Sequence, residues 1–224
     1  MKKALVISGG GSKGAFAGGV AQYLMKKENR SYDLFIGTST GSLMVSHLAL
    51  GMLDELQHLY TNVNQETIFS NNPFRIKMVA GEKVISIRHL NTLWNFLNGR
   101  KTFGESKNLR TLIKNNITEK MYEEIRKSNK EVVVTVSNLT ANQIEYKSSN
   151  DCAYEDFTDW IWGSCNYVPF MSLLEKDHCQ YADGGFGSLV PIREAILRGA
   201  TEIDAIILET EVSQINRVPS KNPF

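Results

Sequence analysis

The feature that most restricts the fold of this chain is an alternation of short apolar runs with helical patterns. Residues 4–7 and 34–36 each have the composition of a buried strand, and a glycine-rich turn follows each run. From Gly41 onward, apolar residues recur at three- and four-residue steps, which predicts a helix. Strands that alternate with helices indicate an α/β fold with a mainly parallel sheet and helices on both faces.

The remaining elements continue this alternation. Apolar spacing predicts helices at 109–113 and 121–125, and residues 132–136 form the clearest β run, with which 143–147 can pair. A short strand ends at Ala182, Pro191 suits the first turn of a helix that Gly199 ends, and 203–208 reads as a last buried strand. The first helix, rich in small residues, is predicted to lie close to the sheet, with Phe16, Val20 and Leu24 filling the gaps. The helix after Gly41 is predicted to continue through Met52 to Leu59.

The length and charge of the chain limit the classes of protein to which it can belong. At 224 residues, one domain at 1–210 with a tail or linker at 211–224 is expected. The net charge of +1 argues against bulk binding to nucleic acid. No run approaches the ~18 apolar residues of a spanning helix. The three cysteines lack paired zinc-ligand spacing, so we expect reduced, mostly buried thiols in a cytoplasmic protein.

Ser39 lies between two glycines in the pattern Gly37-x-Ser39-x-Gly41, after a strand and before a helix. This is the context of a nucleophile elbow, where side chains at the glycine positions would crowd a strained turn. The helix that follows would point its positive end at the reacting centre. A serine that only caps the helix is the alternative interpretation.

A second glycine box, Gly9 to Gly14, also joins a strand to a helix. Its bare backbone can aim several N–H groups at one anionic oxygen, as an oxyanion hole requires. The same residues fit the dinucleotide fingerprint Gly-x-Gly-x-x-Gly, which needs an acid at the end of the second strand. Asp33 precedes that strand, so it is placed at the wrong end to hold a ribose. A tight structural turn is the third interpretation.

Asp183 is the best candidate for a base that activates Ser39. It ends a strand and is followed by Gly184 and Gly185, which allow a sharp turn and a close approach. The histidines are less suitable, because none follows Asp183 as a triad in the hydrolase order would require. His47 and His58 are predicted to share a solvated helical stripe, His89 has no evident partner, and only His178 is kept in reserve.

The two glycine boxes and Asp183-Gly184-Gly185, in this order, resemble the motifs of patatin-like phospholipases. The segment Trp162 to Phe170 is similar to the family's serine-rich segment ahead of the catalytic Asp, and Pro191, Ala195 and Gly199-Ala200 also match. The resemblance covers about residues 4–210 and implies a three-layer α/β/α fold with a mainly parallel central sheet.

The resemblance also implies a mechanism. Ser39 would be the nucleophile and Asp183 the general base, with the N–H groups of Gly10 and Gly11 forming the oxyanion hole and Lys13 retaining the family's charge. The chain would hydrolyse lipid or phospholipid esters at a membrane surface, with no metal or organic cofactor. A dinucleotide-binding oxidoreductase and a non-catalytic interaction module remain alternatives. Head group, acyl preference and oligomeric state are not determined by the sequence.

Residues 62–108 match nothing that can be aligned with the family. They mix apolar and aromatic side chains with cations, a composition that suits a flap touching a lipid surface. The apolar members are Phe74, Ile76, Met78, Val79, Trp94, Phe96 and Leu97. The alternative is that these side chains pack in the main core.

Overall fold

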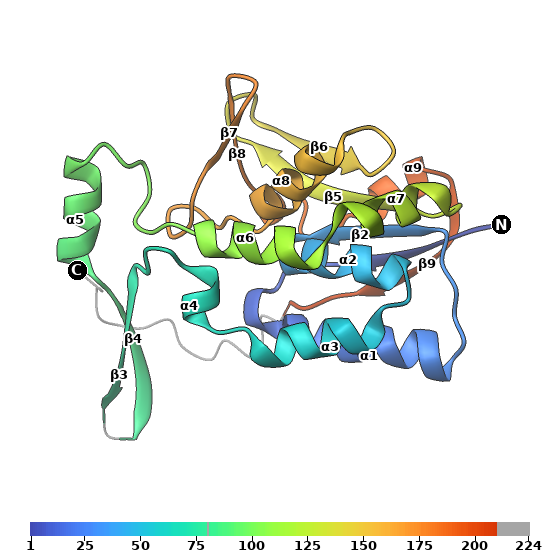
Figure 1. The fold of residues 1–224 in the computed structure, drawn as a ribbon, viewed down its shortest axis with the longest axis horizontal. Helices are drawn as coiled ribbons and strands as arrows, with labels where there is room; N and C mark the ends of the chain where they lie inside the picture. The colour runs from blue at the N-terminus through green and yellow to red at the C-terminus, as the bar shows by residue number, and fades with distance from the viewer. Residues whose placement is uncertain (80, 210–224) are drawn as a thin grey trace.

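The fold is an α/β sheet with helices packed on it, from which one smaller segment projects (Figure 1). A computed structural model describes residues 1–79 and 81–209. The predicted tail at 211–224, including Asn216 to Phe224, lies outside these residues. The strands are β1 (Lys2–Ile7), β2 (Leu34–Thr38), β3 (Phe74–Val79), β4 (Glu82–Ile87), β5 (Glu131–Asn138), β6 (Gln143–Ser148), β7 (Leu174–Lys176), β8 (Cys179–Asp183) and β9 (Ala200–Ile206).

The helices occupy the intervals between these strands. They are α1 (Gly14–Gln22), α2 (Ser42–Ala49), α3 (Leu53–Asn62), α4 (Gln65–Ile68), α5 (His89–Leu97), α6 (Lys107–Asn116), α7 (Glu119–Lys127), α8 (Tyr154–Ser164) and α9 (Ile192–Leu197). Short 3-10 turns η1 (Gly11–Lys13), η3 (Ser39–Gly41) and η4 (Gly184–Phe186) follow β1, β2 and β8, and α1 runs on into a π-helical turn, η2 (Tyr23–Lys27). The strands and helices predicted from the apolar runs around these positions are confirmed, with one correction. The last strand, predicted as buried at 203–208, is β9 at Ala200–Ile206, which ends the strand order and is mostly partly exposed.

The central sheet has the order β7-β8-β5-β2-β1-β9, and β6 also pairs with β5. Strands β9, β1, β2 and β5 run parallel to one another, whereas β6, β7 and β8 add an antiparallel portion. The predicted mainly parallel α/β architecture is therefore confirmed, with an antiparallel extension beyond β5.

The pairing of β5 brings the ends of two distant strands together. Strand β2 runs along β5 as far as the pair Thr38 and Thr135, and β8 approaches from the opposite direction to pair Asp183 with Val136. Because β6 already occupies the other edge of β5 here, β2 and β8 share one edge and meet end to end. Asp183 and the residue after Thr38, which is Ser39, therefore lie close together.

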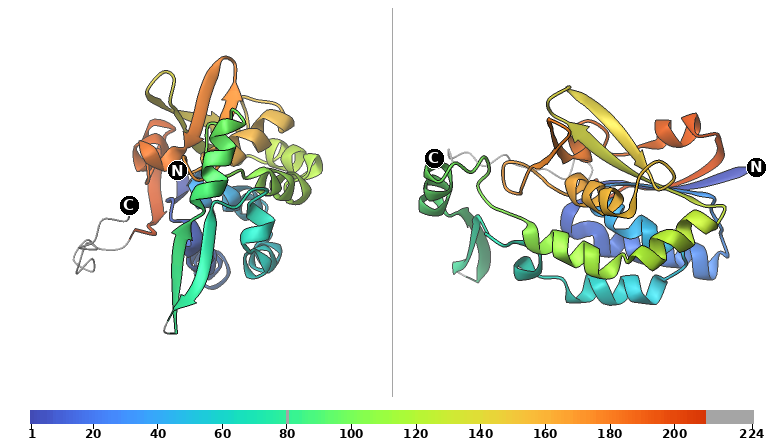
Figure 2. Two further views of the ribbon diagram at one scale, coloured as in Figure 1. Left: turned by 90° about the vertical axis from the view of Figure 1, so that its left-hand side faces the viewer. Right: turned by 45° about the horizontal axis from the view of Figure 1, so that its top comes forward.

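The core has two halves, one on each face of the sheet, because side chains alternate across each strand. The two halves are unequal in size. Leu5, Phe35 and Val134 belong to the large cluster on the face covered by most helices. Val6 and Ile36 belong to a smaller cluster that includes Ala195 of α9 on the other face. The turned view in Figure 2 shows α9 on the side of the sheet away from the other helices. The three layers are present, but the third is thin.

Two details of the predicted helices are corrected. The helix after Gly41 is not continuous to Leu59, because Gly51 has a φ of +71° and separates α2 from α3. In α1, Ala17 and Ala21 are buried, but Phe16 is 66% exposed and does not fill a gap against the sheet. The close approach of α1 therefore depends on its buried alanines, and Phe16 faces solvent.

Part of the segment at 62–108 projects from the body of the protein. The antiparallel hairpin β3–β4 and helix α5 lie beyond the end of the sheet in both Figure 1 and Figure 2. We call residues 73–101 the projecting unit. Most of its large apolar side chains are exposed, including Trp94 at 65% and Met78 at 63%. The interpretation that they pack in the main core is therefore wrong for these side chains.

Candidate active site

Ser39 lies at the tip of a strained strand-to-helix turn. It follows β2, begins η3, and has a φ of +53°, a conformation that is uncommon for a residue with a side chain. From this position its Oγ donates a hydrogen bond of 2.6 Å to Oδ2 of Asp183. The sequence placed these two residues 144 positions apart, and the meeting of β2 and β8 on β5 brings them into contact.

The Asp183 carboxylate is buried and held from both sides. The residue is 4% exposed, and its Oδ1 accepts a 2.8 Å hydrogen bond from the backbone N–H of Gly185. Burial raises the pKa of Asp183 above its usual value, although the hydrogen bonds from Ser39 and Gly185 act in the opposite sense. A higher pKa makes this carboxylate a stronger base than a solvated Asp, so its proton-accepting form is lost at a higher pH as the solution is acidified.

The glycines of the Ser39 turn are required by close backbone contacts. A Cβ on Gly41 would lie 2.4 Å from the carbonyl oxygen of Ile7, at the end of β1. A Cβ on Gly37 would lie 2.5 Å from the carbonyl carbon of Gly41. The turn is therefore compact enough only without side chains at these two positions.

The first glycine box packs directly beside Ser39. A Cβ on Gly9 would lie 3.2 Å from Cβ of Ser39, and one on Gly14 would lie 2.5 Å from Oγ1 of Thr40. The N–H of Gly9 is used, because it donates to the carbonyl of Leu189 at 3.2 Å. Within the described residues, no backbone carbonyl accepts from Gly10 or Gly11. These are the two positions that the resemblance assigns to the oxyanion hole.

Asp33 and Lys13 make contacts of a structural kind. Asp33 precedes β2, and its carboxylate accepts a 2.8 Å hydrogen bond from the backbone N–H of Lys3. It therefore lies at the opposite end of β2 from Ser39, which weakens the dinucleotide interpretation. Lys13 donates from Nζ to the carbonyl of Leu208 at 3.0 Å, linking the glycine box to the chain after β9.

A serine that sequence reasoning did not single out supports the turn. Ser164, at the end of α8, accepts a 3.0 Å hydrogen bond at its Oγ from the N–H of Ser39. The same Oγ bonds to the hydroxyl of Ser42 at 2.7 Å, and Ser42 in turn donates to the carbonyl of Gly37. Ser164 therefore connects both ends of the elbow. The only sequence signal for Ser164 was that it lies in the serine-rich segment, and the resemblance gave no function to any single residue of that segment.

The residues after Ser164 continue this support toward Asp183. The thiol of Cys165 donates to the carbonyl of Ser39 at 3.1 Å, and the carbonyl of Asn166 accepts from the N–H of Asp183 at 2.9 Å. Asn166 is held by the hydroxyl of Ser106 at 2.6 Å. One short segment thus fixes the backbone of both Ser39 and Asp183. Among the three free cysteines, only Cys165 is buried, so the prediction of mostly buried thiols is correct for that one alone.

The histidines lie away from this pair. His58, His89 and His178 are exposed, whereas His47 is 3% exposed in the core, so its predicted solvated position is wrong. The break at Gly51 changes the phase between α2 and α3, and α2 is buried on nearly all sides. Burial lowers the pKa of His47, which favours its neutral form.

Single replacement of any of the four histidines by glutamine is expected to leave most ester hydrolysis intact. The reason is that no described hydrogen bond joins a histidine to Ser39 or Asp183. The measurement is kcat/KM on a soluble ester for each variant, with the thermal midpoint as the control for folding. A loss of about a thousandfold at His178 would reveal a triad of unusual order.

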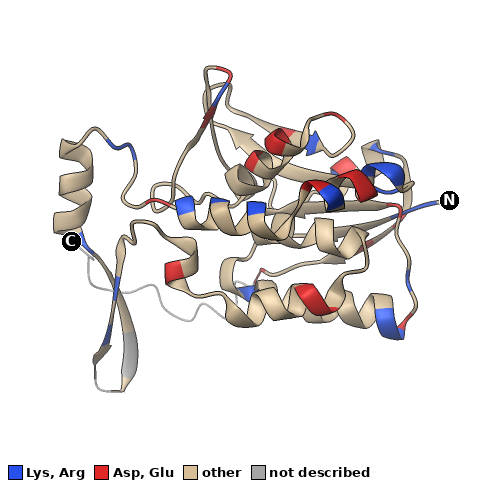
Figure 3. Ribbon diagram, in the orientation of Figure 1, with Lys and Arg blue, Asp and Glu red and all other residues tan. Residues whose placement is uncertain are grey.

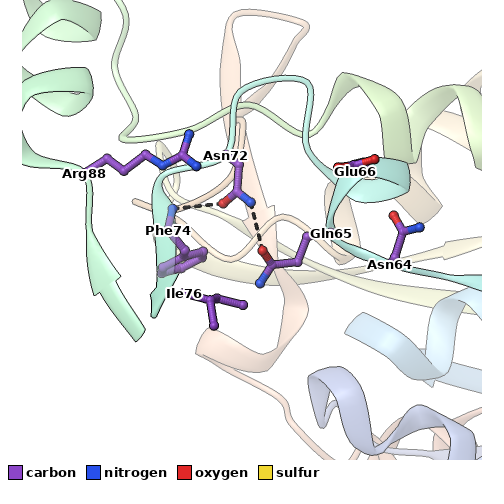
Figure 4. A pocket seen from close by; sticks show the side chains of 7 residues that line it. All are labelled: Asn64, Gln65, Glu66, Asn72, Phe74, Ile76 and Arg88. Carbon is purple, nitrogen blue, oxygen red and sulfur yellow. Dashed lines mark hydrogen bonds between the residues drawn. The ribbon is translucent and has the colours of Figure 1, made fainter. Parts of the chain in front are cut away.

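A hollow of about 470 Å³ lies between α4 and the start of β3, lined by Gln65, Asn72, Phe74 and Arg88 among others, and it shares no residue with the Ser39 site (Figure 4). Among residues 1–79 and 81–209, no group of three or more His, Cys, Asp or Glu side chains is placed to hold a metal ion. No helix in that part of the chain has the length and apolar character needed to cross a membrane.

The comparisons with known proteins agree with this architecture. Residues 5–196 match the family model described as "Patatin-like phospholipase". The chain therefore belongs to the patatin-like phospholipase family, and its resemblance to that family is confirmed.

One solved structure shows the same fold. VipD from Legionella pneumophila is similar with a TM-score of 0.52 and 18% sequence identity, over 82% of this chain and 46% of that one. At this identity the likeness shows the fold alone, and the chain spans less than half the length of that protein. No curated protein sequence matches the chain.

Proposed function

We propose that this chain hydrolyses carboxylic esters of lipids, with phospholipids or lysophospholipids as the substrate class, through an acyl-enzyme on Ser39. The observation that carries the proposal is the 2.6 Å hydrogen bond from Oγ of a strained serine to a buried carboxylate. Family membership supports the same chemistry. A copy without activity would have no need to maintain the strain at Ser39 and the burial of Asp183 together.

In the first half of the reaction, Oγ of Ser39 attacks the ester carbonyl while Oδ2 of Asp183 takes the hydroxyl proton. The negative charge that develops on the carbonyl oxygen is stabilised by the N–H groups of Gly10 and Gly11, together with the positive end of the helix that follows Ser39. The tetrahedral intermediate collapses, the ester C–O bond breaks, and Asp183 returns its proton to the departing alcohol. The acyl group remains on Ser39.

In the second half, water replaces the alcohol. Asp183 takes a proton from the water as it attacks the acyl carbonyl, and the proton passes to Oγ of Ser39 when the acid leaves. One carboxylate can perform both steps because burial raises its pKa and the Gly185 N–H holds it in place. We also propose that the protein is cytoplasmic, since its three cysteines are free. We propose in addition that it contacts membranes peripherally.

Covalent labelling tests the proposal directly. Incubation with a fluorophosphonate is expected to add one label to the peptide that carries Ser39, because the probe reacts with activated serines. Ser39→Ala should remove the label, whereas Ser188→Ala, at a serine whose hydroxyl accepts from Tyr146 and has no described bond to Asp183, should retain it. Absence of any adduct on the folded protein, together with saturable NADH binding, would favour the oxidoreductase interpretation instead.

A further inference from the structure

Helix α5 turns its apolar side to solvent. Leu90, Leu93, Trp94 and Leu97 are spaced as one helical face, and they are 86%, 57%, 65% and 72% exposed. In an ordinary surface helix this face would be packed against the core. Isolated exposed apolar residues are common, but a contiguous face of this size indicates a surface that binds something.

The polar side of α5 faces the protein instead. Asn95 is 2% exposed, and its side chain donates to the carbonyl of Phe103 at 2.7 Å and accepts from Asn71 at 3.0 Å. Asn91 donates to the side-chain oxygen of Asn71 at 2.7 Å. Buried amides lose free energy unless they are hydrogen-bonded, so these contacts fix the rotation of the helix. The outward direction of the leucines is therefore built into the fold.

The hairpin beside α5 has an apolar strip on one face and two cations on the other. The register pairs Ile76 with Ile85, and these two side chains are 45% and 62% exposed on the same face as Met78. Arg75 and Lys77 alternate with them and so lie on the other face. The apolar patch of α5 is thus accompanied by a second exposed apolar strip in the same unit.

The charge of the projecting unit differs from that of the rest of the chain. Residues 73–101 contain six Lys or Arg residues and a single Glu, although the whole chain has a net charge of only +1. The remainder is therefore net acidic. Figure 3 shows Lys and Arg, without Asp or Glu, along the described part of β3, just before α5 and in the segment after α5. Such a unit is electrostatically complementary to a negatively charged surface.

A row of aromatic rings joins the projecting unit to the dyad. Phe186 follows Asp183 by three positions and stacks on Tyr167 at a centroid distance of 5.1 Å, and both rings are about half exposed. From Tyr167 the row continues to Phe170, where it branches. One branch ends at Phe74, and the other runs through Phe103 to Phe96. Successive ring centroids in the row are 5.1–6.3 Å apart. A surface seated on the projecting unit would therefore extend toward the Ser39 site.

We propose that the projecting unit is a docking surface for a bilayer that contains anionic lipid. The leucines and Trp94 of α5 enter the head-group region, and the cations lie near lipid phosphates. The aromatic row leads an acyl chain from the bilayer toward Ser39. This inference rests on the proposed function, because it assigns the surface on which that reaction occurs. A second copy of the chain or a protein partner would not require the excess of cations in residues 73–101.

Vesicle binding tests the docking surface separately from hydrolysis. The full chain with Ser39→Ala, which cannot consume lipid by the proposed reaction, is expected to float with phosphatidylcholine vesicles that contain phosphatidylserine more than with phosphatidylcholine alone. Leu93→Ser with Leu97→Ser should lower the partition about tenfold or more. The matched control is Ile196→Ser with Leu197→Ser in α9, whose side chains are 58% and 70% exposed at the other end of the molecule.

A charge-reversal pair separates the electrostatic contribution of the cations from the apolar contribution of α5. Arg75→Glu with Lys77→Glu should abolish the preference for anionic vesicles, whereas Lys120→Glu with Lys127→Glu on α7 should retain it. In the active chain, Trp94→Ala should slow hydrolysis of aggregated phospholipid about tenfold while a short soluble ester is hydrolysed at an unchanged rate.

Three results would overturn the docking surface. They are the absence of vesicle binding by the folded Ser39→Ala chain, equal losses in the α5 and α9 pairs, and a dimer in light scattering that only the α5 pair converts to a monomer. None of them depends on ester hydrolysis. An inactive protein that still binds anionic vesicles would refute the proposed function alone.

Discussion

Replacement of Asp183 by asparagine is expected to lower kcat for ester hydrolysis by about 10⁴-fold. Asparagine keeps the size of the side chain but cannot accept the Ser39 proton. Ser39→Ala should cause a loss of similar size, and the double variant should be little worse than either single one, because each group is useless without the other. The measurement is single-turnover hydrolysis of a soluble ester, with each variant at the same folded concentration.

Asp177→Asn provides the matched control for this prediction. Asp177 is exposed in the turn that precedes β8. Its replacement removes the same carboxylate group at a position that does not contact Ser39. Its activity should equal that of the wild type. Near wild-type hydrolysis by Asp183→Asn would end the dyad hypothesis, and additive losses in the double variant would show that the two residues act in separate steps.

Gly41→Ala is expected to lower the free energy of unfolding by about 3 kcal/mol, because the new methyl group would lie 2.4 Å from the carbonyl oxygen of Ile7. Backbone on both sides must shift, which also moves Ser39 relative to Asp183. For a chain of this size the thermal midpoint should fall by about 6–12 °C. Ester hydrolysis at a temperature where the variant is still folded should fall as well.

Gly19→Ala is the corresponding control at an exposed position of α1. A Cβ at Gly19 meets nothing within 4 Å, and alanine is the better helix former by about 1 kcal/mol. This variant should therefore be as stable as the wild type or slightly more stable, with unchanged activity. If Gly41→Ala were equally harmless, the turn around Ser39 would be less tightly packed than the structure indicates.

Local patterns were sufficient to predict much of this molecule. The apolar runs predicted β1, β2 and β5, because a strand buried on both faces must be apolar at nearly every position. The order of the glycine boxes and Asp183 pointed to the family, since the turns they form depend on residues only a few positions apart. The error at His47 has a different cause, because α2 is buried on nearly all sides and apolar spacing along the chain does not show this.

Only the tertiary structure decided how distant residues meet. The contact between Ser39 and Asp183 depends on two strands that share one edge of β5, and no local pattern encodes which edge a strand occupies. Likewise, Ser164 supports the Ser39 turn through a hydrogen bond across 125 positions. The helix α5 is another case, because the sequence predicted no helix at 89–97, and the side that faces solvent is set by Asn95 and its partners. By itself, the sequence determined the elements and the chemical groups, since these follow from neighbouring residues. The tertiary structure determined their geometry, since it follows from packing between segments far apart in the chain.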